Sequence, residues 1–145
     1  MERFWMVAIG GLVPALAFGV GAIFQKGAAL QGMQVGTYIL FAGAVTLVGG
    51  LIMRFAFGET GWTLGAVPMA IGGGLGMAIG TGAFTFALVR LGAPVSLIAP
   101  ITVVSTLVTV FLSFLIFKEH EGVVALRLVA GALLVVAGAA LVATS

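Results

Sequence analysis

Long apolar stretches, separated by short polar breaks, run through the whole chain. Each stretch is close to the roughly 20 residues that a helix needs to cross the hydrocarbon core of a bilayer. The five stretches are Phe4–Phe24, Gly36–Met53, Leu64–Val89, Val95–Phe117 and Val123–Val142. Charged residues, glycines and prolines gather in the breaks, where they are typical of helix ends. We therefore predict five transmembrane helices, with neighbours in sequence packed antiparallel.

Composition excludes a water-soluble fold. The 145 residues are 62% hydrophobic and only 7% charged, whereas soluble domains carry about 25% charged residues. Inside a bilayer every backbone polar group must be satisfied within the protein, which favours helices over open strands. The expected fold class is therefore an all-α integral membrane protein, in which residues 1–145 form a single five-helix membrane domain.

The scarcity of polar chemistry limits what the chain can bind or catalyse. Its six basic and four acidic residues are scattered, so no patch for nucleic acid is expected. Cysteine is absent and His120 is the only histidine, which argues against a metal site, and we expect no cofactor. No stretch pairs a nucleophile with a base or holds a His–Glu metal motif, so we do not expect an enzyme.

The first stretch begins like a secretory signal peptide, with Arg3 ahead of an apolar run. That run continues to Phe24, beyond the usual length of a signal core, so we expect a retained first helix. One side of the membrane would carry Arg3, Arg54, Lys118 and Arg127, and the other Lys26 and Arg90. By the positive-inside rule the N-terminus lies in the cytoplasm, in a multi-pass protein of the cytoplasmic (inner) membrane.

Small residues form a smooth strip along the third stretch. Gly72, Gly76 and Gly80 recur one helical turn apart, and Ala83 and Ala87 continue the same face. Lipid gives apolar helices no hydrophobic reason to associate, so close backbone approach over small residues supplies the contact. We expect this strip to pack against a neighbouring helix, and Gly76→Leu to abolish assembly.

A stripe of hydroxyl groups marks the fourth stretch. At 100° per residue its members fall within an arc of about 100°; they are Thr102, Ser105, Thr106, Thr109 and Ser113. The functional interpretation is a cavity wall for a polar solute, and the structural one is a set of local or interhelical hydrogen bonds. Pro100, near the start of this stretch, either opens the helix or forms a hinge.

Further candidates for a solute pathway lie near the ends of the first and third stretches. Gln25 and Lys26 could face a cavity, although Lys26 could equally extend to the headgroups. Thr81 and Thr85 lie roughly opposite the glycine strip, which leaves these threonines, with Phe84, to face either a cavity or lipid. Aromatic residues such as Phe84 also serve as packing or interface anchors.

Several segments in order resemble the drug/metabolite transporter superfamily, in its EamA-like branch. The residues that carry this resemblance are Gly19–Lys26, Phe84–Leu88, Gly92–Ile98, Pro100, the Lys118–Glu119 turn and Gly131–Gly138. The resemblance implies that the chain is a single five-helix repeat, half of a ten-helix transporter, and works as a homodimer. Its last helix, with Gly131 and Gly138, is similar to the dimerisation helix of small multidrug resistance proteins. Packing within one protomer is the alternative role for these glycines.

The resulting hypothesis is a half-size secondary transporter that moves a small polar metabolite across the membrane by alternating access. The first helix holds no Asp or Glu after Glu2, which argues against the proton-coupled cation export of small multidrug resistance proteins. The alternative is a non-transporting accessory subunit or membrane assembly factor that packs through its glycine-rich helices.

Overall fold

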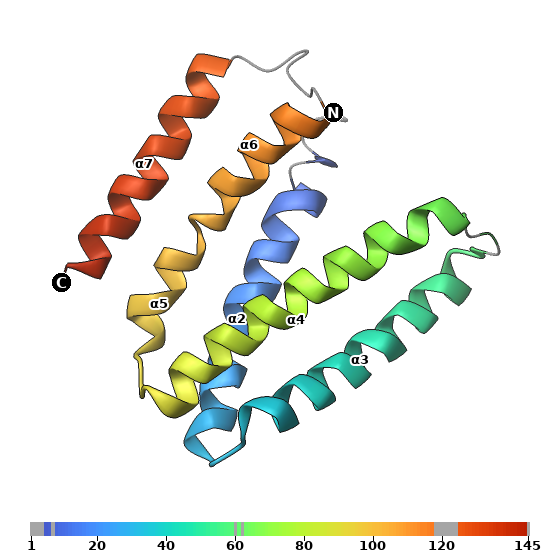
Figure 1. The fold of residues 1–145 in the computed structure, drawn as a ribbon, viewed down its shortest axis with the longest axis horizontal. Coiled ribbons are helices and arrows are strands. Elements are labelled where there is room, and N and C mark those ends of the chain that lie inside the picture. The colour runs from blue at the N-terminus through green and yellow to red at the C-terminus, as the bar shows by residue number, and fades with distance from the viewer. Residues whose placement is uncertain (1–4, 7, 60, 62, 118–124, 145) are drawn as a thin grey trace. The chain divides into compact units, whose positions relative to one another are not determined.

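The computed structural model describes every residue except 1–4, 7, 60, 62, 118–124 and 145, and omits the side chains of residues 125–127 and 143 (Figure 1). Within these limits the chain is helical and has no β-strand, so the all-α prediction is confirmed for the described part. Contacts group the residues into two compact units, Met1–Gly92 and Ala93–Ser145. The expected single five-helix domain stays a prediction.

The first unit contains three long helices. A π-helical turn, η1 (Ala8–Leu12), leads into α2 (Val13–Leu30), followed by α3 (Val35–Ala56). A 3₁₀ turn, η2 (Leu64–Ala66), then leads into α4 (Val67–Arg90). The second unit contains α5 (Val95–Thr102), α6 (Ser105–Phe117) and α7 (Ala125–Ala143). Within that unit α7 returns beside α5.

The predicted end of the first helix is wrong. The polar pair Gln25–Lys26 was expected to close it, but α2 continues to Leu30. Gln and Lys are good helix formers, so polarity alone does not end the helix. The helix instead stops at Gly32, whose φ of 82° is a left-handed conformation that glycine adopts without strain. Gln25 and Lys26 therefore lie inside α2, more than a turn before its end.

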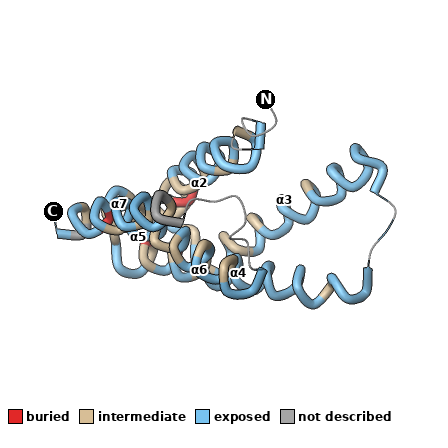
Figure 2. The backbone as a smooth tube through the Cα atoms, turned by 90° about the horizontal axis from the view of Figure 1, so that it is seen from above, coloured by how far each residue is buried: buried red, intermediate tan, exposed pale blue. Residues whose placement is uncertain are grey.

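Among the residues that the structure describes, four helical segments are long and apolar enough to cross a membrane. They are Ala8–Leu30, Val35–Ala56, Leu64–Arg90 and Val95–Phe117, and a shorter apolar segment, Leu128–Val142, lies in α7. Exposed positions predominate along these helices in Figure 2. Bulky apolar side chains are among them, for example Phe18, Phe41 and Met69. Such a surface suits lipid and not water. The coordinates support a helical membrane protein, while a fifth span remains a prediction.

The core of the first unit lies along the C-terminal half of α4, which contacts both α2 and α3. Thr85 and Leu88 are buried there, and a Cβ added to Gly82 would lie 3.3 Å from Cδ1 of Ile39 in α3. The N-terminal half differs, because residues 68–80 are all exposed. A Cβ added to Gly72, Gly76 or Gly80 would meet no described atom within 4 Å. Any helix that packs on the glycine strip must therefore come from outside this unit.

Two substitutions on α4 separate packing inside the unit from packing outside it. Gly82→Leu should lower the free energy of unfolding by about 1–3 kcal/mol, because the new side chain must displace Ile39. Gly76→Leu should change the unit's stability by less than about 0.5 kcal/mol, because the site is open. Unfolding of purified protein in detergent measures both. Equal losses would contradict the division of α4 into a packed and an open half.

Candidate functional site

A buried polar cluster joins α2 to α4 in the first unit. The side-chain amide of Gln25 donates a hydrogen bond to the Thr85 hydroxyl and another, at 3.4 Å, to the carbonyl oxygen of Thr81. The Thr85 hydroxyl in turn donates to the same Thr81 carbonyl at 2.7 Å. Thr85 is only 1% exposed and Gln25 is buried as well. Three of the predicted pathway residues are thus brought together from positions 25, 81 and 85.

The amide N–H groups of Gln25 and the hydroxyl of Thr85 find their acceptors within the cluster. One Gln25 amide and one Thr85 hydroxyl supply the donors, and the hydroxyl and carbonyl oxygens accept them, so the bonds form a closed triangle. None of these three groups is ionisable, which leaves no general acid or base within the cluster. Its chemistry is therefore that of a polar link between two helices. Lys26 and Phe84, both half-buried, flank it on α2 and α4.

The fourth candidate span is interrupted where the sequence predicted one continuous helix. The segment Val95–Phe117 keeps its predicted bounds, but α5 ends at Thr102 and α6 begins at Ser105. Through the interruption the backbone makes tighter bonds, from Val103 N to Pro100 O at 3.2 Å and from Val104 N to Ile101 O at 3.0 Å. Such 3₁₀ bonding in the middle of a helix is typical of a functional hinge or of a sequence under strain.

Pro100 lies inside α5 and does not open it, because Pro94 occupies the N-cap. Its ring removes the N–H that would bond the carbonyl of Ser96, which weakens the helix. A run of β-branched residues, Ile101 through Val104, follows directly, and such residues crowd a helix. The Thr102 hydroxyl also donates to Ala99 O at 2.7 Å, in competition with the backbone.

The hydroxyl stripe is largely bonded to its own helices. Thr109 donates to Ser105 O at 3.0 Å, and Ser113 to Val110 O at 3.0 Å, as Thr102 does to Ala99 O. The structural interpretation of the stripe therefore holds for these three hydroxyls. Thr102, Ser105, Thr106 and Thr109 are exposed and Ser113 is half-buried. A hydroxyl that donates to a carbonyl keeps lone pairs, so the stripe can still accept hydrogen bonds.

A groove of about 340 Å³ lies between α6 and α7 in the second unit. Among the described residues that line it, Thr106 has the only polar side chain, and the others include Leu107, Val110, Leu128, Gly131 and Ala132. Gly131 thus borders a groove within the unit, whereas Gly138 is exposed and a Cβ there would meet no described atom within 4 Å.

Sequence reasoning identified Gln25 and Thr85 separately but missed their contact, because nothing in the sequence fixes how α2 crosses α4. It also missed the interruption at residues 103–104, for which the β-branched run after Pro100 was the available signal. Several predicted features lie outside the described residues, namely Arg3, the Lys118–Glu119 turn, His120 and the Arg127 side chain.

Comparison of the chain with protein-family models, curated proteins and solved structures finds no match in any of the three. Among the described residues, no group of three His, Cys, Asp or Glu side chains is placed to hold a metal ion.

A double-mutant cycle should detect the link between α2 and α4. Thr85→Val leaves the buried Gln25 amide without its hydroxyl partner, whereas adding Gln25→Leu removes the unpaired amide. We expect a coupling free energy of about 1 kcal/mol, as for interhelical hydrogen bonds in other membrane proteins.

Unfolding of the single and double variants in detergent measures this coupling. Thr46→Val is the matched control for Thr85→Val, because the Thr46 hydroxyl donates within α3 to Ala42 O at 2.8 Å. Its coupling with Gln25→Leu should be zero. A zero value for the Gln25–Thr85 pair as well would show that their hydrogen bond contributes nothing to packing.

Proposed function

We propose that this chain is a half-size secondary transporter of the drug/metabolite transporter type, moving a small polar metabolite by alternating access. The observation that carries the proposal is the interruption of a candidate membrane span at Val103–Val104. α5 has eight residues, so the interruption lies about 12 Å along a span that reaches about 34 Å. That position is within the depth of the hydrocarbon core.

Irregular backbone at this depth favours a solute pathway. Tighter 3₁₀ bonds pair the backbone of this short interruption, as they do at prolines in other transmembrane helices, whereas longer non-helical segments at this depth do not face lipid. Such segments are tolerated where they are covered by protein or line a water-filled cavity. Thr102, Val103 and Ser105 are exposed on their own unit, so the proposal assigns them to a pathway wall. Discontinuous helices form substrate sites in many secondary transporters.

Two further features fit a carrier. The exposed hydroxyls of Ser105 and Thr106 flank the interruption and could exchange hydrogen bonds with a solute. The Gln25–Thr85 link fixes the C-terminal half of α4, whereas residues 68–80 in its N-terminal half are all exposed. A second protomer would complete the pathway. We place this homodimer in the inner membrane, with the N-terminus in the cytoplasm.

Removing two hydroxyls from the stripe should reduce transport without unfolding the protein. We expect Thr106→Val combined with Thr109→Val to lower uptake about tenfold, the effect of losing two uncharged hydrogen bonds to a solute. Purified protein in liposomes, first screened against a panel of radiolabelled polar metabolites, provides the assay. Thr46→Val is the matched control and should transport normally. Unchanged uptake by the double variant would assign the stripe to local helix bonding.

An accessory subunit or assembly factor is the second candidate, favoured by the uncovered strip of Gly72, Gly76 and Gly80. A smooth helix face with open space around it suits a helix from another membrane protein. The two candidates differ in whether the purified chain is sufficient. Uptake by the chain alone favours the transporter, and uptake that requires a second purified protein favours the accessory subunit.

Cysteine cross-linking should test the proposed homodimer, because the natural chain contains no cysteine. We expect Gly138→Cys on α7 to form disulfide-linked dimers in membranes under mild oxidation. Ala140→Cys, about 200° further around the same helix and also exposed, is the matched control and should stay monomeric. Gel electrophoresis without reductant measures both. Equal yields at the two positions would indicate random collision and contradict a dimer interface at Gly138.

A further inference from the structure

The groove between α6 and α7 has the size of a small-molecule site. Its volume is about 340 Å³, and sites for small ligands begin at about 300 Å³. The wall formed by α7 carries Leu128, Gly131, Ala132 and Val135, whose spacing places them on one face of that helix. A Cβ added to Gly131 would meet no described atom within 4 Å, so the space beside this face is open.

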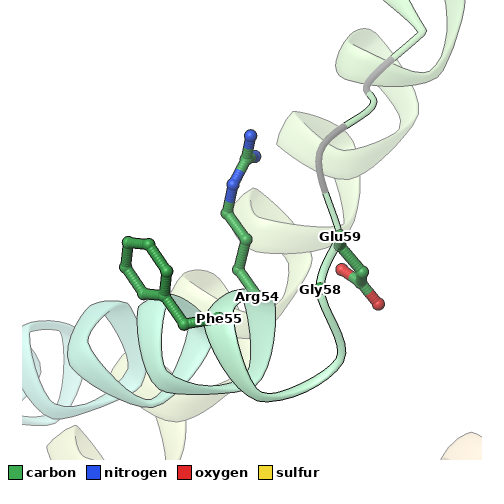
Figure 3. A pocket seen from close by; sticks show the side chains of 4 residues that line it. All are labelled: Arg54, Phe55, Gly58 and Glu59. Carbon is green, nitrogen blue, oxygen red and sulfur yellow. The ribbon is translucent and has the colours of Figure 1, made fainter.

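Another hollow, at the C-terminal end of α3, does not form such a site. It measures about 370 Å³ and is lined by Arg54, Phe55, Gly58 and Glu59. Figure 3 shows the Arg54 guanidinium and the Glu59 carboxylate pointing away from each other. The two charged groups therefore do not converge on one ligand.

The groove begins directly after the interruption at Val103–Val104. α7 packs against α5, the part of the span before the interruption, and the groove opens beside α6, the part after it. Thr106, Leu107 and Val110 form the α6 wall. On the opposite wall Gly131 contributes no side chain, so part of the space between the two helices stays unfilled.

One hydroxyl in this lining lacks the local partner that the Thr109 hydroxyl has. Thr109 donates to Ser105 O, four residues back, at 3.0 Å. The residue four back from Thr106 is Thr102, across the interruption, and the Thr106 N–H donates to Val103 O at 2.9 Å. The Thr106 hydroxyl makes no hydrogen bond to a described residue. It is therefore available to a ligand.

The depth of Thr106 in the membrane makes a partner for this hydroxyl valuable. Thr106 lies about 17 Å from Val95 along a span that reaches about 34 Å. At that depth there is little water, and an unpartnered hydroxyl in apolar surroundings costs free energy. A ligand that fills the groove and also bonds the hydroxyl is therefore favoured over one that only fills the groove.

We propose that the groove binds a small uncharged molecule with an apolar body and one hydroxyl group, such as a phenol. The apolar body contacts Leu107, Val110 and Leu128, and the ligand hydroxyl exchanges a hydrogen bond with Thr106. A dry cavity of about 150 Å³ holds one benzene ring, so the groove has room for a substituted ring. The segment Val95–Phe117 contains no ionisable side chain. A charged analogue would therefore lose its hydration without gaining a counter-charge from this wall.

Two other occupants fit less well. An acyl chain matches the apolar lining but offers no group to the Thr106 hydroxyl. A helix from a second copy is too thick, because one turn about 10 Å across and about 5.4 Å long takes up about 420 Å³. That volume exceeds the whole groove. Binding of matched probes distinguishes these three occupants.

Fluorine NMR of the purified protein in detergent can test the site with 4-fluorophenol, 4-fluorotoluene and 4-fluorobenzoate. We expect Thr106→Val to weaken binding of the phenol about fivefold, the effect of losing one uncharged hydrogen bond, and to leave binding of the toluene unchanged. Thr106→Ser, which keeps the hydroxyl, should bind both as the wild type does. Gly131→Leu fills the groove and should abolish binding of both. The benzoate should bind the wild type about tenfold more weakly than the phenol.

Ala140→Leu is the matched control, because Ala140 is exposed on the opposite side of α7, about 180° from Gly131. This variant should bind the phenol and the toluene as the wild type does. Circular dichroism and gel filtration show whether each variant folds, and the isosteric Thr106→Val keeps the test decisive if Gly131→Leu does not fold. Equal effects of Thr106→Val on the phenol and the toluene would assign the groove to acyl chains and overturn the proposal.

A second copy of the chain is tested separately. Loss of Gly138→Cys cross-linking when Gly131→Leu is added, with phenol binding intact, would assign the groove to that copy and also overturn the proposal. Thr106 belongs to the proposed pathway wall as well, but binding is measured at equilibrium, without transport. Phenol binding by a chain that transports nothing would contradict the transporter alone, and uptake without phenol binding would contradict this site alone.

Discussion

Inside a bilayer, a backbone N–H or C=O group has no water to bind, and each must find its partner within the protein. The C-terminal ends of two helices, several hydroxyl side chains and the break between α5 and α6 follow this constraint. α2 and α3 end in motifs in which a glycine with positive φ lets the chain bond back onto the last carbonyls. Thr46, Thr102, Thr109 and Ser113 direct their hydroxyls to carbonyls of the preceding turn. Even where α5 gives way to α6, tighter bonds keep the backbone paired.

The same constraint explains why the few interhelical polar contacts matter. Apolar side chains gain little by leaving lipid for one another, so a hydrogen bond between helices can decide which faces meet. In the first unit, Gln25 and Thr85 supply that bond between α2 and α4, next to the close contact of Gly82 with Ile39. The packed part of this unit is therefore defined by one polar link and one small residue, and not by a large apolar core.

Much of the helical layout could be predicted from the sequence, because length and apolar composition directly reflect the thickness of a bilayer. The ends of α3 and α4 lie close to their predicted positions, and the glycines at 58 and 92 account for them. The end of α2 was wrong because Gln25 and Lys26 are compatible with a helix, and only Gly32 stops it. The interruption at residues 103–104 depends on competition among Pro100, a β-branched run and the Thr102 hydroxyl. The pattern of apolar residues alone does not reveal that competition. The pairing of Gln25 with Thr85 depends on a crossing between distant helices, which one sequence does not specify.

The two halves of α4 are under different packing constraints. From Thr81 onward, a substituted side chain must still pack against α2 and α3. The fold of the unit therefore limits which residues can stand there. Between Pro68 and Gly80 every residue is exposed, so packing inside the unit limits these positions less. A smooth face there would erode over generations unless some surface beyond the unit selected for it. In related chains, the range of residues found between Pro68 and Gly80 would therefore show how strongly a surface beyond the unit constrains this face.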